Sequence, residues 1–276
     1  MPFSFSGKHL FVIFKLVNLA IFFPFAFITV ITVVFSFSCA NPETQRIMVF
    51  SAASLVDVLQ ETAPEFEKQT GTKLIFNFAG SQTLAGEISN GGPADIFISA
   101  GHSPARFLVD RGHIKEENIL ELVENVLVVA TSDDGEYVNF SDIAELANMH
   151  RIAIADPDLA PAGEYAKEAL HNIGIWSAIS RRTILAADVR TALAYVQTGD
   201  VDAAVVYITD VSIAKGVSTK LFINGMHHTP IVYPAAVVEN AREPVLGKEY
   251  LDFLTTAYAS SVFEKYGFAS VKEKIN

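Results

Sequence analysis

The sequence has one cysteine, Cys39, and one tryptophan among its 276 residues. A single cysteine excludes an intramolecular disulfide. The chain also has no G-x-x-x-x-G-K-[ST] phosphate loop and no G-x-G-x-x-G dinucleotide motif. No group of His, Cys, Asp and Glu has the spacing of metal ligands. These absences argue against a nucleotide-dependent enzyme and a metalloenzyme, and we expect no cofactor and no direct metal ligands.

Basic residues are scarce as well, with 20 Lys and Arg against 31 Asp and Glu. Lys8 and Lys15 precede residue 40 and every acid follows it, so the rest of the chain has 18 basic and 31 acidic side chains, a net charge of −13. This charge argues against a nucleic-acid partner. It would also oppose an anionic ligand, unless groups other than Lys and Arg bind that ligand.

An apolar run without any charge, residues 16–38, follows the two lysines and ends next to Cys39 and Ala40. This order is typical of an export signal, and we favour its removal or processing. The apolar run is also long enough to span a bilayer, which leaves a retained anchor open. We therefore expect segment 1–40 to be a signal peptide or a membrane or lipid anchor. Cys39 is either a lipidated residue or a bystander, and the protein is periplasmic or otherwise extracytoplasmic.

Strand-like and helix-like runs alternate through the rest of the chain. In the first helix-like run, Leu55, Val58, Leu59 and Phe66 recur at helical spacing, and Gly71 ends the run. A single helix is predicted at 249–268. The strand-like runs span 46–50, 73–79, 94–100, 124–131, 151–157 and 202–210. The alternation predicts an α/β protein with parallel sheets, in which ligands bind beside the carboxyl ends of the strands.

Four joints between a strand and a helix stand out at that edge. Ser54 and Ser81 each open a helix, Ala162 follows a proline at the start of another, and Asp188 is a natural N-cap ahead of Val189. Each helix start leaves backbone N–H groups without an intrahelical acceptor and carries the positive end of the helix dipole. Such joints can bind an oxyanion without any cationic side chain.

A nucleophilic serine is the alternative interpretation of Ser54 and Ser81, and it would make the protein a hydrolase. Neither serine has the flanking glycines of a G-x-S-x-G elbow. An S-x-x-K pair is also absent, because the third residue after each serine is Asp57 or Leu84. A structural N-cap is the other alternative. Tyr207, at the end of an apolar strand, is either a tyrosine at the edge of the core or a hydroxyl donor to an anion.

Several motifs of the chain, in this order, resemble the molybdate-binding protein of bacterial molybdate ABC importers. They are VFSAASLVDVL, FAGSQTLAGEI, GGPADIFISA, DPDLAPAGEYAKEAL, ADVRTALAYV, AAVVYITD, YPAAVVE and EKYGF, between residues 46 and 268. The resemblance implies a two-lobed periplasmic-binding-protein fold of type II, each lobe a mostly parallel sheet flanked by helices, with the ligand in the cleft between the lobes. It implies that 46–124 plus 239–276 form lobe 1 and 125–238 form lobe 2.

The resemblance also implies an oxyanion site made of neutral donors. Ser54 and Ser81 would each give a hydroxyl and an N–H, Ala162 and Val189 an N–H, and Tyr207 its hydroxyl. The implied ligand is molybdate, with tungstate as a second ligand, and the implied partners are the permease and ATPase of an ABC importer. We expect a monomer without enzymatic activity.

Two departures from the family pattern bear on cavity size. Gly80 and Gln82 flank Ser81 where relatives often have a run of serines, and Ile208 follows Tyr207 where a small residue is common. Another tetrahedral oxyanion such as sulfate, or a membrane-anchored oxyanion sensor, remains an alternative.

Overall fold

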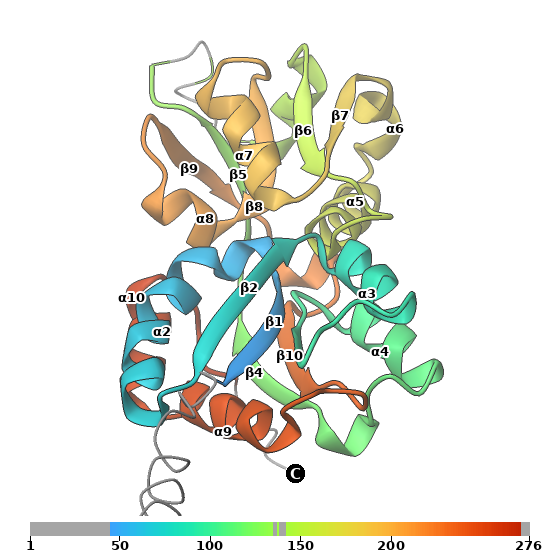
Figure 1. Ribbon diagram of the computed structural model, residues 1–276. Helices are drawn as coiled ribbons and strands as arrows, with labels where there is room; N and C mark the ends of the chain where they lie inside the picture. The colour runs from blue at the N-terminus through green and yellow to red at the C-terminus, as the bar shows by residue number, and fades with distance from the viewer. Residues whose placement is uncertain (1–44, 135–136, 138–141, 272–276) are drawn as a thin grey trace, which may run out of the picture. The chain divides into compact units, whose positions relative to one another are not determined.

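The computed structural model describes residues 45–134, 137 and 142–271. The expected export segment 1–40 and Cys39 lie outside this part. The described chain forms two five-stranded sheets, each flanked by helices, which is the expected two-lobed α/β architecture (Figure 1). In these residues no helix is long and apolar enough to cross a membrane.

The first sheet has the strand order β2-β1-β3-β10-β4. Its strands are β1 (Arg46–Ala52), β2 (Lys73–Ala79), β3 (Ile96–Ile98), β4 (Leu120–Glu124) and β10 (Val232–Val237). The α-helices that accompany it are α2 (Val56–Thr70), α3 (Ser81–Ser89), α4 (His102–Asp110), α9 (Pro244–Leu254) and α10 (Ala257–Lys265).

The second sheet has the strand order β7-β6-β8-β5-β9. Its strands are β5 (Leu127–Ser132), β6 (Ile152–Ala155), β7 (Thr183–Ala186), β8 (Ala203–Tyr207) and β9 (Val217–Phe222). Its α-helices are α5 (Pro161–Ile173), α6 (Trp176–Ile179), α7 (Val189–Gln197) and α8 (Ile208–Ile213).

Each sheet contains one reversed strand at the same place in its order. β1 is parallel to β2 and β3, whereas β10 is antiparallel to both β3 and β4. In the second sheet β6 is parallel to β7 and β8, whereas β5 is antiparallel to β8 and β9. The two reversed strands are the ones by which the chain enters the second sheet and returns to the first.

The chain returns to the first sheet before β10, which is earlier in the sequence than expected. A boundary at Val238–Glu239 would leave β10 in lobe 2, but β10 pairs Ala235 with Ile98 on one side and with Leu120 on the other. The physical reason is burial, because an apolar strand between two partners satisfies its backbone on both sides. The chain crosses in the other direction between the end of β4 and the start of β5.

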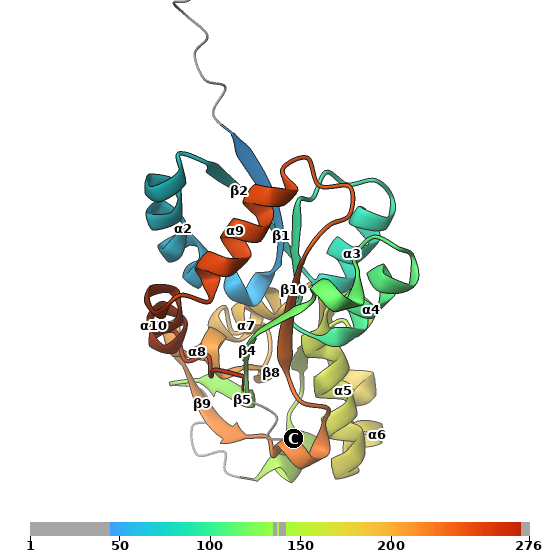
Figure 2. The ribbon, with the colours of Figure 1, turned by 90° about the horizontal axis from the view of Figure 1, so that it is seen from below.

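The predicted last helix is two helices. It breaks at Thr255 and Thr256, where the Thr256 hydroxyl accepts from the N–H of Ala259 and begins α10. A threonine whose side chain bonds to the backbone favours a helix start over a helix interior. The break lets α9 and α10 both pack beside α2 on the first sheet (Figure 2).

The inner strands of both sheets are almost continuously buried, as expected for sheets covered on both faces, whereas the edge strands β2, β4, β7 and β9 are only partly buried. Every residue of β6 and of β8 is buried, and β5 is buried from Leu127 to Thr131. Gly71 ends α2 in the left-handed conformation, with φ 73°, as the sequence predicted. The helices that follow β1, β2 and β6 begin shortly after these strands end, at the carboxyl edges of the sheets.

Candidate functional site

A small cavity lies at the carboxyl ends of β1, β2 and β8, between elements of the two sheets. All five predicted site residues line it: Ser54, Ser81, Ala162, Val189 and Tyr207. The other lining residues are Ala52, Ala53, Ala79, Gly80, Ala100, Ala160, Pro161 and Asp188. The structure thus brings the five predicted residues together although Ser54 and Tyr207 are 153 positions apart in the sequence.

Ser54 lies in a 3-10 turn, Ala53–Leu55, and α2 begins only at Val56. Its side chain makes no capping hydrogen bond, so a structural N-cap does not explain this serine. The Ser54 Oγ lies 2.9 Å from the hydroxyl of Tyr233, and the residue is 2% exposed.

Ser81 is the first residue of α3 and is fully buried. It does not cap its helix either. Its Oγ accepts a hydrogen bond from the backbone N–H of Ala100 at 3.1 Å. A backbone N–H can only donate, so the Ser81 hydroxyl keeps its own hydrogen for another acceptor. Together with its N–H, Ser81 can supply two donors to the cavity.

Ala162 and Val189 contribute backbone rather than side chains. Ala162 follows Pro161 in the first turn of α5, and Val189 is the first residue of α7. Asp188 caps α7 as predicted, accepting from the N–H of Thr191 at 2.9 Å. N–H groups in the first turn have no intrahelical acceptor, and the helix dipole makes this end positive.

Tyr207 is the last residue of β8 and is fully buried. Its hydroxyl has no hydrogen-bond partner within the described part of the chain. Burial raises the pKa of Tyr207 well above its usual value, with Tyr233 adding to the shift, so the group stays protonated and can donate. A buried donor without a partner is unfavourable unless a ligand or water accepts from it.

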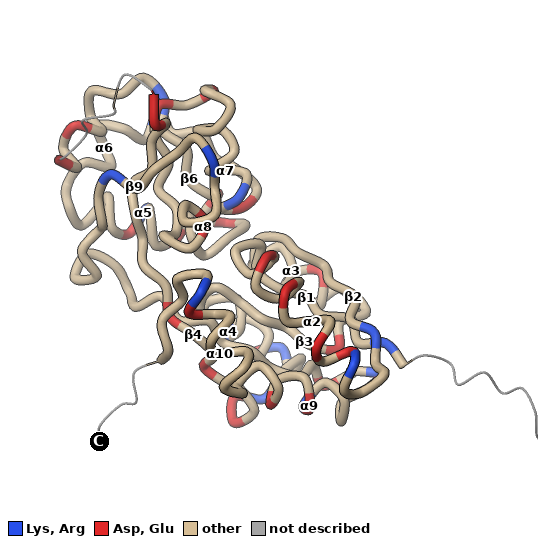
Figure 3. The backbone as a smooth tube through the Cα atoms, turned by 90° about the vertical axis from the view of Figure 1, so that its left-hand side faces the viewer, with Lys and Arg blue, Asp and Glu red and all other residues tan. Residues whose placement is uncertain are grey.

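Within the described part of the chain, no cationic residue lines the cavity. Arg190 follows Val189 but is engaged by carboxylates, with Asp57 Oδ2 at 2.6 Å and Asp210 Oδ1 at 2.5 Å. Burial alone would lower the pKa of Arg190, but Asp210 and then Asp57 raise it overall. Acidic residues are spread along both halves of the described chain (Figure 3). Only neutral donors and helix starts therefore face the cavity, apart from the capping carboxylate of Asp188.

Gly80 permits close contact between the two halves of the site. A Cβ on Gly80 would overlap the carbonyl group of Leu159 and lie 3.0 Å from the carbonyl oxygen of Ala187. Gln82 does not line the cavity and donates to the carbonyl of Pro157 at 3.2 Å, and Ile208 does not line it either. Of the departures noted in the sequence, Gly80 alone bears directly on the cavity.

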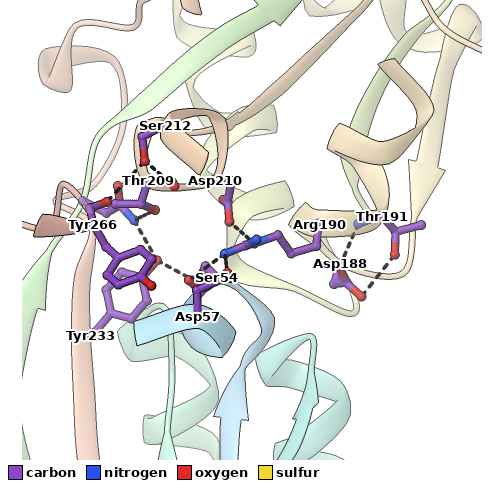
Figure 4. A network of polar contacts seen from close by, with 11 residues as sticks. Ser54, Asp57, Asp188, Arg190, Thr191, Thr209, Asp210, Ser212, Tyr233 and Tyr266 are labelled. Atoms are coloured by element: carbon purple, nitrogen blue, oxygen red, sulfur yellow. Dashed lines mark hydrogen bonds and ion pairs between the residues drawn. The ribbon is translucent and has the colours of Figure 1, made fainter. Parts of the chain in front are cut away.

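The sequence did not assign a role to two residues behind Ser54. Tyr233 and Asn125 are buried and hydrogen-bonded to each other. Tyr233 also contacts Ser54, as Figure 4 shows. Tyr233 opens the motif YPAAVVE, and Asn125 precedes the strand LVVATS. Both motifs can be recognised in the sequence. The contacts of Tyr233 with Ser54 and Asn125 join residues 179 and 108 positions apart, and no local pattern predicts contacts at such separations.

Catalysis by either serine has little support in this geometry. Among the described residues no histidine lines the cavity, and its one carboxylate, Asp188, caps α7 by accepting from the N–H of Thr191. The described residues also contain no group of three or more His, Cys, Asp or Glu that could hold a metal ion.

Comparison with known proteins gives consistent matches. The model of the family described as bacterial extracellular solute-binding protein matches residues 47–269. The molybdate-binding protein ModA of Escherichia coli (strain K12) is 36% identical over 228 residues, covering 81% of this chain and 88% of the relative. ModA of Haemophilus influenzae is 34% identical over 231 residues, covering 82% and 90%.

Among solved structures, the periplasmic molybdate-binding protein of Azotobacter vinelandii superposes with a TM-score of 0.74 at 21% identity. The match covers 82% of this chain and all of that one. At this identity the likeness shows that the fold is shared.

Proposed function

Because the chain belongs to the family of bacterial extracellular solute-binding proteins, we propose that it captures molybdate and delivers it to the permease of an ABC importer. The observation that carries the proposal is the fully buried hydroxyl of Tyr207, which has no hydrogen-bond partner among the described residues and lies at a cavity lined by neutral donors. An oxyanion would give that hydroxyl its missing acceptor.

The five predicted residues would hold the anion by hydrogen bonds alone. Ser54 and Ser81 give hydroxyl and N–H groups, Ala162 and Val189 give N–H groups, and Tyr207 gives its hydroxyl. Molybdate is a dianion without a proton, so every oxygen can accept. Hydrogenphosphate carries a proton that needs an acceptor, and a site made of donors leaves that proton unbonded.

Selection against sulfate would rest on size, because sulfate is also an unprotonated dianion. A smaller ion cannot reach every donor, and each donor left unsatisfied costs about 1–3 kcal/mol. Tungstate matches molybdate in charge and shape, and we propose it as a second ligand. We also propose that the protein binds the anion without turnover and that its two halves close around it. The permease and its ATPase would then recognise the closed form.

Titration calorimetry of the purified chain with molybdate, tungstate, sulfate and hydrogenphosphate tests the ligand. We expect molybdate and tungstate to bind tightly and the other two weakly. Equal binding of sulfate and molybdate would place the protein among sulfate binders.

Substitution tests the site. Ser54→Ala and Ser81→Ala should each weaken molybdate binding without unfolding the chain. Ser51→Ala is the matched control, because Ser51 is a fully buried serine on β1 that does not line the cavity. Unchanged molybdate affinity in both site variants would show that the site is assigned wrongly.

A further inference from the structure

The hydroxyl of Tyr233 connects Ser54 to a residue that does not touch the cavity. Tyr233 lies on β10 and is fully buried. Its oxygen is 2.9 Å from Ser54 Oγ, a contact that Figure 4 shows, and 3.0 Å from Asn125 Nδ2. Neither Tyr233 nor Asn125 lines the cavity, and Ser54 is the lining residue to which Tyr233 is hydrogen-bonded.

The orientation of the Asn125 amide is fixed by the backbone. Its Oδ1 accepts from the N–H of Val126 at 2.8 Å, and that N–H can only donate. The other end of the amide is therefore Nδ2, which donates to Tyr233 and, at 2.9 Å, to Thr209 Oγ1. An amide NH₂ group has no acceptor capacity, so Tyr233 must accept from Asn125.

This leaves one destination for the phenol hydrogen. Burial raises the pKa of Tyr233 far above its usual value, so the hydrogen is retained. Of the two side chains within hydrogen-bond distance of the phenol oxygen, Asn125 can only donate, and Ser54 can accept. Ser54 Oγ thus accepts from Tyr233, and its own hydrogen is left for the cavity.

We propose that Asn125 and Tyr233 are positioning residues that fix the direction of the Ser54 hydroxyl, so that it donates to the bound anion and cannot accept from a protonated one. The proposal rests on the function proposed above and explains how a hydroxyl, which can both donate and accept, is restricted to donation. Ser81 is restricted in the same way, by the N–H of Ala100. All three hydroxyls of the site then present hydrogens to the ligand.

Asn125→Asp tests the direction of the chain of hydrogen bonds. The carboxylate can still accept from Val126, but its second oxygen accepts where Nδ2 donated. Tyr233 then donates to Asp, Ser54 donates to Tyr233, and a lone pair of Ser54 faces the cavity. We expect the ratio of hydrogenphosphate Kd to molybdate Kd to fall by about tenfold or more, since molybdate loses a donor and hydrogenphosphate gains an acceptor.

The ratio separates this effect from charge and from loosened structure. At an alkaline pH well above the second pKa of inorganic phosphate both anions are dianions, and an added carboxylate repels them equally. A loss of packing would likewise weaken both together. If the wild type binds hydrogenphosphate too weakly for its Kd to be measured, a lower limit for that Kd is sufficient to show that the ratio falls in the variant.

Tyr233→Phe provides a second variant without any added charge. It leaves Ser54 free to rotate and to accept, so the same ratio should fall severalfold. Tyr250→Phe is the matched control, because Tyr250 is also fully buried but its hydroxyl makes no hydrogen bond to a cavity residue in the described part of the chain, and the ratio should stay at the wild-type value.

An unchanged ratio in Tyr233→Phe, or in a folded Asn125→Asp, would overturn the inference while leaving the proposed function intact. A wild type that binds no molybdate would instead refute the proposed function. In that case sulfate, another unprotonated dianion, takes the place of molybdate in the ratio, and the same outcomes decide the inference.

Discussion

At the scale of single residues, the hydroxyl of Tyr207 should have opposite effects on the free and the bound protein. Without an acceptor it destabilises the folded chain, and with an anion it contributes a hydrogen bond. We therefore expect Tyr207→Phe to raise the ligand-free unfolding free energy by about 1 kcal/mol. Molybdate affinity should fall by about tenfold, or ~1.4 kcal/mol.

Urea unfolding and calorimetry on the same two proteins measure the two effects. A variant that loses both stability and affinity would indicate that Tyr207 is only a packing residue.

Asp210 predicts a pH dependence of stability. The residue is fully buried in α8, and burial raises its pKa from 3.8 to about 6, although the nearby Arg190 opposes the shift. Because the folded-state pKa is raised, this group's stabilising contribution is fully present below about pH 3.8 and is lost as the pH rises through about 6.

Asp210→Asn should remove that contribution. Between neutral pH and about pH 4, the unfolding free energy of the wild type should rise relative to that of the variant by up to about 3 kcal/mol. Urea unfolding of both proteins across this range checks the difference. Parallel pH profiles would show that Asp210 has an ordinary pKa in the folded protein.

At the scale of elements, the joint between β2 and α3 depends on the absence of a side chain at Gly80. A Cβ there would overlap the carbonyl of Leu159, which is backbone and cannot turn aside. Gly80→Ala should therefore push the two halves of the site apart and weaken molybdate binding by more than tenfold.

Gly86→Ala is the control within the same helix, because a Cβ at Gly86 meets nothing within 4 Å. It should leave binding unchanged and stabilise α3 by up to about 1 kcal/mol. Calorimetry on both variants makes the comparison, and equal affinities would show that the close approach is unimportant for binding.

Local signals in the sequence predicted the elements that local chemistry determines. The left-handed glycine after α2, the Asp188 cap of α7 and the strand–helix joints all follow from residue types and spacing. The same reasoning located every predicted site residue at the cavity, because the carboxyl edges of the sheets were predictable.

What the sequence left undetermined is nonlocal. β10 belongs to the first sheet through pairing with strands more than 100 residues earlier, and no periodicity reports that pairing. The contact of Tyr233 with Ser54 depends on it, so the residue behind the site could not be predicted either. The division of 249–268 into two helices depends on one threonine side chain, which helical periodicity overlooks.

At the scale of the whole molecule, Arg190 links helices from the two sheets. It extends from α7 to Asp57 on α2, and their side chains are 28% and 36% exposed. The pair is accessible to salt, so it should favour the closed arrangement only modestly. Asp57→Asn should weaken molybdate binding a few-fold at low ionic strength and less at high ionic strength.

Asp252→Asn is the matched control, since its partner Lys248 lies on the same helix, α9. Calorimetric titrations of both variants with molybdate at two salt concentrations test whether the Arg190–Asp57 pair contributes to binding electrostatically. A loss of affinity that is the same at both concentrations would exclude an electrostatic link between the halves.

A site of neutral donors on an acidic chain also has a kinetic consequence. The proposed anion would approach a protein whose residues after position 40 carry a net charge of −13, so long-range attraction cannot speed its arrival. Tight binding must then come from slow dissociation, as short-range hydrogen bonds hold the anion after capture. Added salt should accelerate association by screening the repulsion and leave the residence time nearly constant, the opposite of what a site built from lysines would show.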